Sequence, residues 1–181
     1  MNEVNGDEVI VVRHARPDDA AVAAELLAEL GYPVSIDQVV ERLARGTAAA
    51  DNAVLVVEAG GRTVGLASFH RIPLFHADGF LGRITSFVVA RTHRQRGVGR
   101  RLIAAVEEFA WAQGCIRLEV TSGDHRPEAH IFYERVGYAS DCRRFIKKRT
   151  TIGRLASDGA TTPAPVISRC IVSVGSCDRF P

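Results

Sequence analysis

The spacing of hydrophobic and polar residues predicts that the chain begins with one strand and two helices. Apolar β-formers mark a strand at 8–14, and apolar residues at helical spacing follow over 17–31. A second helix is expected to begin at Ser35, which forms a capping-box pattern with Gln38. Its apolar stripe is expected to consist of Ile36, Val40 and Leu43.

Three consecutive strands are expected next, joined by hairpins. Residues 52–72 contain two apolar runs on either side of Gly60 and Gly61, a glycine pair typical of a tight turn between strands. A third, long apolar strand is expected at 81–90. These strands predict an antiparallel part of the sheet.

The second half of the domain alternates between helix and strand. A helix that runs to about Gly114 is followed by a strand at 115–123 and a short helix that begins at Pro127. One or two last strands are expected in 138–148.

The order of these elements predicts an α/β (α+β) fold. The strands at either side of the helix before Gly114 should run parallel, so the sheet should be mixed, with helices on both faces. The composition becomes rich in Thr, Gly, Ala and Pro after about Lys148. We therefore expect one domain at 1–148 and a tail at 149–181, as flexible segments have this composition.

Composition and charge narrow the function classes. The chain of 181 residues is 46% hydrophobic and 24% charged, which is typical of a globular domain. A net charge of +2 argues against a nucleic-acid partner, and no apolar run is long enough to predict a membrane span. The cysteines form no CxxC pair, so we expect free thiols in a reducing cytoplasm.

Positive charge and glycine are concentrated in one stretch, 91–103, between an apolar strand and a helix. Its five arginines and two glycines favour an anion site, because a helix start offers unpaired N–H groups and arginine matches phosphate oxygens. The alternative is a solvated helix start. The P-loop pattern is absent, and Leu102 stands where a dinucleotide fingerprint needs its last glycine.

Two motifs resemble the GNAT superfamily of acetyl-CoA-dependent N-acetyltransferases. The first is [QR]-x-x-G-x-[GA], filled by Arg94, Gly97 and Gly99. The second is A-x-x-F-Y-E followed by glycine and an aromatic, within "PEAHIFYERVGY" at 127–138. The resemblance covers roughly 8–148 and implies a sheet whose two parallel strands splay apart, with the acetyl thioester in the gap.

The resemblance also implies which residues bind acetyl-CoA. The backbone of Phe87, Val88 and Val89 would bind the pantetheine arm. The N–H groups of the loop would hold the pyrophosphate: Arg94, Gln95, Arg96, Gly97, Val98, Gly99 and Arg100. The family often has Asn where this chain has Arg126, whose guanidinium would either bind a phosphate or face solvent.

Acetyl transfer by direct attack of an amine needs a base for the amine and an acid for the thiolate. Tyr133 stands at the family's usual general-acid position, although an aromatic there can also be a packing residue. Glu119 is the main candidate base, with an Arg117–Glu119 ion pair as the alternative. His125 or desolvation with a water relay also remain open.

The reaction predicted from the sequence is therefore acetyl transfer from acetyl-CoA to a primary amine of a small molecule or peptide. A non-catalytic acyl-CoA-binding or regulatory module is the alternative. No metal is expected, because His70 and His76 lack metal-ligand spacing with a partner. The acceptor and the oligomeric state are left open, with a homodimer as one option.

Overall fold

The structure is a computed structural model that describes residues 8–48, 51–141 and 144–147. All of its helices and strands lie within Met1–Ser140, which forms one compact unit. In chain order the elements are β1 (Ile10–His14), η1 (Pro17–Asp19), α1 (Ala20–Glu29), α2 (Ile36–Ala48), β2 (Asn52–Ala59), β3 (Arg62–Pro73), β4 (Phe80–Val89), η2 (Arg91–His93), α3 (Val98–Ala112), β5 (Cys115–Val120) and α4 (Pro127–Arg135).

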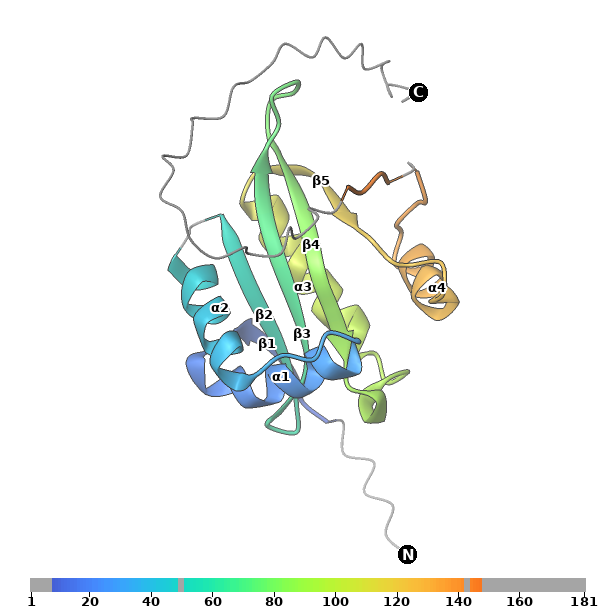
Figure 1. Cartoon of the computed structure of the whole chain (residues 1–181). Helices are drawn as coiled ribbons and strands as arrows, with labels where there is room; N and C mark the ends of the chain where they lie inside the picture. Colours follow the sequence, from blue (N-terminus) through green and yellow to red (C-terminus); the bar gives the residue numbers. More distant parts are fainter. Residues whose placement is uncertain (1–7, 49–50, 142–143, 148–181) are drawn as a thin grey trace, which may run out of the picture. The chain divides into compact units, whose positions relative to one another are not determined.

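The five strands form one mixed sheet in the order β1-β2-β3-β4-β5 (Figure 1). Neighbours from β1 to β4 pair antiparallel, and β4 pairs with β5 in parallel, with α3 as the crossover between them. The predicted mixed sheet is thereby confirmed. The glycine pair at 60–61 forms the turn between β2 and β3, and both residues have positive φ angles, which glycine adopts without strain.

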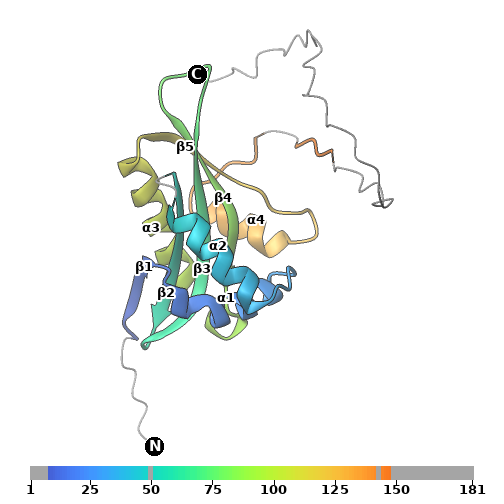
Figure 2. The same ribbon diagram turned by 60° about the vertical axis from the view of Figure 1, so that its left-hand side comes forward.

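Helices cover both faces of the sheet, as the sequence predicted (Figure 2). The side chains of β2 alternate: Val56 packs with α1 and α2, whereas Leu55 and Val57 pack with α3. On α3 the buried residues repeat at helical spacing, and they include Val98, Leu102 and Val106. The period of two in the strands and of 3.6 in the helices therefore produces two cores, one on each face.

The sheet opens between β4 and β5. Their parallel ladder ends at the pair Ile84–Val120, while the pairing of β4 with β3 continues to Val89. Thr85 is an extra residue on β4, because Ser86 and Ile84 oppose consecutive residues of β3. This β-bulge lies where the two parallel strands part, and bulges bend a strand in this way.

The start predicted for α2 is right, and of the three residues predicted for its stripe Leu43 is buried as expected, whereas Ile36 and Val40 are not. Ser35 and Gln38 exchange side-chain bonds with each other's N–H groups at 3.3 Å and 3.1 Å, which is a capping box. The buried residues are Val39 and Leu43, however, while Ile36 and Val40 are half exposed. The adjacent residues Val39 and Val40 point 100° apart on the helix, so the sequence is compatible with an apolar stripe through either of them. Packing against the sheet selects the stripe through Val39.

The strands expected in 138–148 are not formed by residues 138–141 and 144–147, which carry neither helix nor strand. The side chains of Phe145 and Ile146 in this segment are exposed. The predicted tail, 149–181, lies outside the described residues.

Candidate functional site

The loop between β4 and α3 has an unusual backbone. Gln95 has a φ of 61°, the only positive value at a non-glycine position in the described ranges, and Gly97 follows with a φ of 80° as the N-cap of α3. Left-handed residues that alternate with right-handed ones turn the N–H groups of a loop toward one side, which forms an anion-binding nest. The motif glycine is thus needed for its backbone conformation.

Backbone N–H groups in this loop lack partners within the described residues. From Gln95 to Arg100 none donates a hydrogen bond, and the first helical bond of α3 runs from the N–H of Arg101 to the carbonyl of Gly97 at 3.1 Å. A helix N-terminus also carries a partial positive charge. Six N–H groups and the helix dipole therefore favour an anion at this position.

The arginines around the loop divide into two roles. Arg94 braces the backbone, because its Nε donates to the carbonyl of Val89 at 3.0 Å and its N–H to that of Arg91 at 3.4 Å. Arg96 and Arg100 are exposed and make no hydrogen bond or ion pair with the rest of the described chain. These two guanidinium groups remain available to an anionic ligand.

An aromatic cluster joins α4 to the open end of β4. The ring of Phe87 stacks on Phe132 at 5.6 Å between centroids and lies 6.1 Å from that of Tyr133. A Cβ at Gly99 would lie 3.4 Å from the Phe132 ring. Val88 and Val89 are buried on opposite faces of the sheet, so only their backbone is open to a ligand.

The phenol of Tyr133 is largely buried in this cluster. Burial raises its pKa to about 12, against a smaller opposing effect of the nearby Arg126 charge. The phenol therefore keeps its proton at neutral pH and can act only as a donor to an anionic group.

Arg126 neither faces solvent freely nor lies in the phosphate loop. Its Nη2 donates to the carbonyl of Leu30 at 2.5 Å, so this residue ties the start of α4 to the end of α1. The structure thus gives Arg126 a bracing contact that the sequence did not indicate, and a phosphate contact of its guanidinium stays a prediction.

Glu119 is held by two arginines. Its Oε2 lies 2.8 Å from Nη2 of Arg83 on β4, and its Oε1 lies 3.4 Å from Nε of Arg117. The ion pair weighed as an alternative is therefore present, with a second arginine that the sequence did not indicate. Both carboxylate oxygens face cations, which leaves little freedom for a base at this position.

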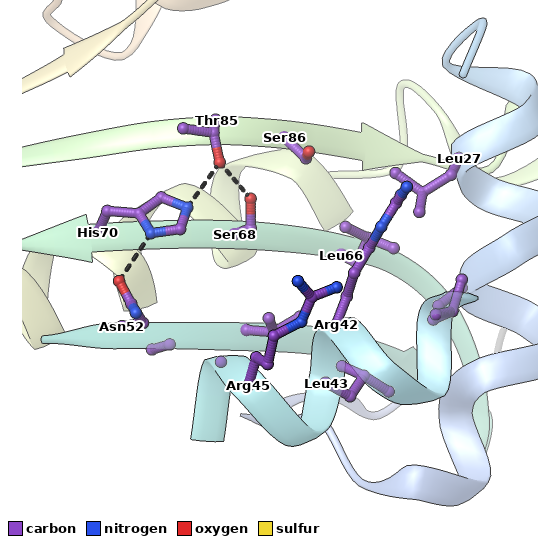
Figure 3. A pocket seen from close by; sticks show the side chains of 15 residues that line it. Leu27, Arg42, Leu43, Arg45, Asn52, Leu66, Ser68, His70, Thr85 and Ser86 are labelled. Carbon is purple, nitrogen blue, oxygen red and sulfur yellow. Dashed lines mark hydrogen bonds between the residues drawn. The ribbon is translucent and has the colours of Figure 1, made fainter. Parts of the chain in front are cut away.

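A cavity of about 480 Å³ lies between α2 and strands β2, β3 and β4 (Figure 3). Its polar lining is Arg42, Arg45, Asn52, Ser68, His70, Thr85 and Ser86. No carboxylate contributes to it. Since Thr85 is the bulge residue, this cavity adjoins the point where β4 and β5 part.

Comparison with known proteins identifies the family. The model of the acetyltransferase (GNAT) family matches residues 20–138. This chain belongs to the GNAT family. The resemblance seen in the two motifs is confirmed, and the splayed mixed sheet is the fold expected for it.

Two curated N-acetyltransferases are similar in sequence. An aminoalkylphosphonate N-acetyltransferase of Salmonella typhimurium is 34% identical over 87 residues, which cover 48% of this chain and 56% of that protein. An aminoglycoside N(6')-acetyltransferase type 1 of Stenotrophomonas maltophilia is 33% identical over 132 residues, 70% of this chain and 84% of that protein. The predicted N-acetyl transfer agrees with both relatives.

A solved structure with a similar fold is that of an aminoglycoside N-acetyltransferase in complex with CoA. It has a TM-score of 0.70 and 19% identity, and the match covers 82% of this chain and 99% of the other. At this identity the likeness concerns the fold.

The GNAT motifs located the loop and α4, but sequence reasoning missed most of the cavity. Asn52, Thr85 and Arg42 belong to no motif, and the sequence assigned His70 no part in the reaction. A signal was present in the polar residues within apolar strands, at Asn52, Ser68, His70 and Thr85, but their meeting depends on sheet register.

Two features are absent from the part of the chain that the structure describes. No group of three or more His, Cys, Asp or Glu side chains is placed to hold a metal ion. No helix there is both long enough and apolar enough to span a membrane.

Proposed function

We propose that this GNAT protein transfers the acetyl group of acetyl-CoA to a primary amine of a small molecule by direct attack. The observation that carries the proposal is the row of unpartnered N–H groups from Gln95 to Arg100, placed beside the gap between β4 and β5. If these N–H groups bind the pyrophosphate of acetyl-CoA, the arm that carries the thioester would lie along the open edge of β4.

Residues around the loop support binding of the pyrophosphate and of the pantetheine arm. Arg96 and Arg100 can reach phosphate oxygens beside the loop, and the unpaired edge of Phe87–Val89 can pair with the amides of a pantetheine arm. The solved CoA complex of a protein with the same fold supports this assignment.

The thiolate leaving group needs a proton donor, and Tyr133 is suited to this role. The amine nitrogen forms a bond to the acetyl carbon, the carbon–sulfur bond breaks, and the sulfur departs as a thiolate that must gain a proton. A buried phenol with its proton retained, next to Phe87 at the open end of β4, is suited to donate it. Glu119, by contrast, is occupied by Arg83 and Arg117.

The charge of the cavity indicates the class of acceptor. Arg42 makes no ion pair or hydrogen bond with described residues. Arg45 donates from Nε to the backbone carbonyl of Glu41 at 3.3 Å, and its Nη2 lies 3.8 Å from the Glu41 carboxylate on the same helix. Without a lining carboxylate, the cavity favours a small amine that also carries an acidic group. The aminoalkylphosphonate relative supports such an acceptor, whereas a polycationic aminoglycoside would meet repulsion.

The acceptor proposal is tested by measuring thiol release from acetyl-CoA with matched amines. We expect aminoalkylphosphonates and amino acids to be acetylated more efficiently than the same alkylamines without the acidic group. Arg42→Gln should raise the KM of the acidic amines at least tenfold and leave the neutral amines unchanged. A preference for aminoglycosides over acidic amines would contradict this acceptor class.

The cofactor proposal is tested by thermal stability. Acetyl-CoA should raise the Tm of the wild type, and Gly99→Glu should abolish the shift, because the new carboxylate repels phosphate and crowds Phe132. Ala104→Glu, at an exposed position on the same helix, is the control and should keep the shift. Binding of acetyl-CoA without turnover of any amine would favour the non-catalytic acyl-CoA module.

The cytoplasmic location and the homodimer, both expected from the sequence, stay predictions.

A further inference from the structure

Four polar side chains from three strands form one hydrogen-bonded chain along the cavity (Figure 3). The Nδ1 of His70 lies 2.7 Å from Oδ1 of Asn52, and its Nε2 lies 2.9 Å from Oγ1 of Thr85. The hydroxyl of Thr85 in turn lies 2.7 Å from that of Ser68. All four residues line the cavity that adjoins the splayed strands.

The contacts of His70 fix the direction of this chain. The Oδ1 of Asn52 can only accept, so Nδ1 of His70 carries the proton and donates it. Nε2 then has a free lone pair and accepts the hydroxyl proton of Thr85. An imidazole in this state is a proton acceptor connected through one hydroxyl to the cavity.

The surroundings keep the imidazole neutral. Burial lowers the pKa of His70 below its usual value of 6.5. The charged groups of its surroundings are Arg42 and Arg45 of α2, which line the same cavity, and Arg83, its register partner on β4, which forms an ion pair with Glu119. Among the described residues that line the cavity no carboxylate is present to stabilise the charged form, so at neutral pH the base can accept a proton.

The reaction needs such a base. An alkylamine with a pKa of about 10.4 is only about 0.04% neutral at pH 7, and the nitrogen must also lose a proton as the amide forms. Thr85 is the bulge residue at the point where β4 leaves β5, so its exposed hydroxyl lies at the border of cavity and gap.

We propose that His70 is the proton acceptor of the reaction, that the Thr85 hydroxyl relays the proton and that Asn52 is a positioning residue for the imidazole. A bound alkylammonium passes one proton to Oγ1 of Thr85 while the Thr85 hydroxyl proton passes to Nε2 of His70, which leaves a neutral amine. The nitrogen lone pair then forms the bond to the acetyl carbon, and the carbon–sulfur electron pair leaves with the thiolate, which Tyr133 protonates. The second nitrogen proton, lost as the amide forms, restores the Tyr133 phenol. This inference rests on the proposed acetyl transfer.

The first test replaces His70 by Gln, which keeps a polar side chain but cannot accept a proton at neutral pH. We expect kcat/KM for an alkylamine to fall by about 10²–10⁴, the usual contribution of a general base. The wild-type rate should drop as the pH falls through the pKa of His70, and the variant should lack this inflection. His76→Gln, in an exposed turn, is the control for the substitution.

The amine itself separates a base from a structural residue. A weakly basic aromatic amine is already neutral at pH 7, so His70→Gln should slow its acetylation far less than that of the alkylamine. An equal loss with both amines, or a loss of acetyl-CoA binding measured by thermal shift, would overturn the base role. So would an unchanged pH profile, or the loss of the inflection in Glu119→Gln instead.

The relay is tested at Thr85. Thr85→Val keeps the shape and removes the hydroxyl, so it should lower kcat for the alkylamine at least tenfold, and Thr85→Ser should restore most of it. Asn52→Leu should shift the inflection rather than remove it, because Nδ1 loses its acceptor. Wild-type activity in Thr85→Val would remove the relay.

The failure of the inference can be distinguished from that of the proposed function. If the wild-type protein acetylates no amine, the proposed function is overturned, and the inference with it. If the wild type is active and His70→Gln is equally active, the inference alone is overturned.

Discussion

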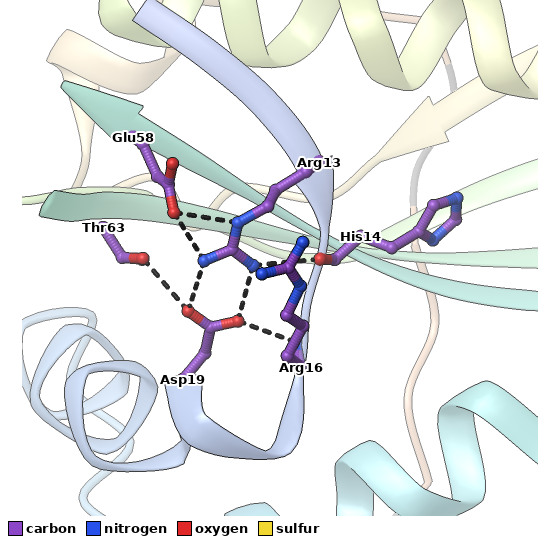
Figure 4. Close-up of polar contacts among 6 residues, drawn as sticks. All are labelled: Arg13, His14, Arg16, Asp19, Glu58 and Thr63. Atoms are coloured by element: carbon purple, nitrogen blue, oxygen red, sulfur yellow. Dashed lines mark hydrogen bonds and ion pairs between the residues drawn. The ribbon is translucent and has the colours of Figure 1, made fainter. Parts of the chain in front are cut away.

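The two ends of β2 carry polar clusters of opposite character. At one end Glu58 belongs to a charged cluster with Arg13, Asp19 and Thr63 (Figure 4). At the other end Asn52 begins the neutral chain through His70 along the cavity (Figure 3). Both clusters join neighbouring strands of the same sheet. All four residues of the second line the cavity of about 480 Å³, whereas of the first only Arg13 borders a cavity, a smaller one of about 280 Å³.

The charged cluster is closed. The carboxylate of Asp19 accepts from Nη1 and Nη2 of Arg13 at 2.8 Å and 2.9 Å, from the N–H of Arg16 at 2.7 Å and from the hydroxyl of Thr63 at 3.1 Å. Its side chain is 7% exposed. These bonds, that of Arg13 above all, lower the pKa of Asp19 to about 2.

The contrast shows how a polar cluster can be assigned. A buried carboxylate whose oxygens all have partners leaves no acceptor for a ligand. Removing one of its partners is destabilising, so such a cluster is assigned a role in stability. The His70 chain is neutral, half exposed and ends in a hydroxyl that borders a cavity. Substitutions in the first cluster should therefore affect folding, and those near the cavity and gap should affect turnover.

The largest effect is expected at the gap, from Tyr133→Phe. Removing a positioned general acid should lower kcat by about 10²–10⁴, while the Tm hardly changes because Phe fills nearly the same volume. Steady-state kinetics with any accepted amine and a melting curve measure both. Tyr138→Phe, at the neighbouring ring, is the control. Near-wild-type turnover in Tyr133→Phe would assign its phenol to packing.

The next largest effect is expected at the closed cluster, from Asp19→Asn. Breaking a buried pair leaves Arg13 with Glu58 alone, so the free energy of unfolding should fall by about 3 kcal/mol. Activity per folded molecule should stay unchanged. Denaturant unfolding checks the first point, with the exposed Asp18→Asn as the control. A loss of turnover at full stability would remove the contrast between the clusters.

Acid should reveal the same cluster. Because the pKa of Asp19 is about 2 when folded and 3.8 as the reference value, its contribution is present above pH 4 and is lost as the pH falls toward 2. The shift corresponds to about 2 kcal/mol. Unfolding free energies measured between pH 5 and pH 2 should decline more steeply for the wild type than for Asp19→Asn. Parallel curves would contradict the assigned shift.

The smallest effect separates two hydroxyls of β3. Thr63→Val removes one of four bonds to Asp19 and should cost about 1 kcal/mol of stability. Ser68→Ala, at the open cluster, should change stability by less than about 0.5 kcal/mol and turnover by a few-fold. Melting curves and steady-state kinetics of Thr63→Val and Ser68→Ala measure whether stability changes in the first variant and turnover in the second.

Local features could be predicted from the sequence because contiguous residues produce them. The loop at 94–100 depends on glycine conformations and a helix start, and the capping box at Ser35 and Gln38 on a spacing of three. The mixed sheet followed from the order of strands and helices. The α2 stripe was missed because sequence spacing left two faces open, and the last strands because an apolar run alone does not show whether a core is there to receive it.

The sequence by itself thus indicated the GNAT family and located the glycine-containing loop at 94–100 and the helix that carries Tyr133, since each depends on a short segment. Only the tertiary structure decided what Glu119 and His70 can do. Glu119 meets Arg83 through the β4–β5 register, and His70 meets Asn52 and Thr85 through two registers and a bulge. Pairings of this kind join residues far apart in the chain, and a register shift of one residue would turn each side chain to the other face.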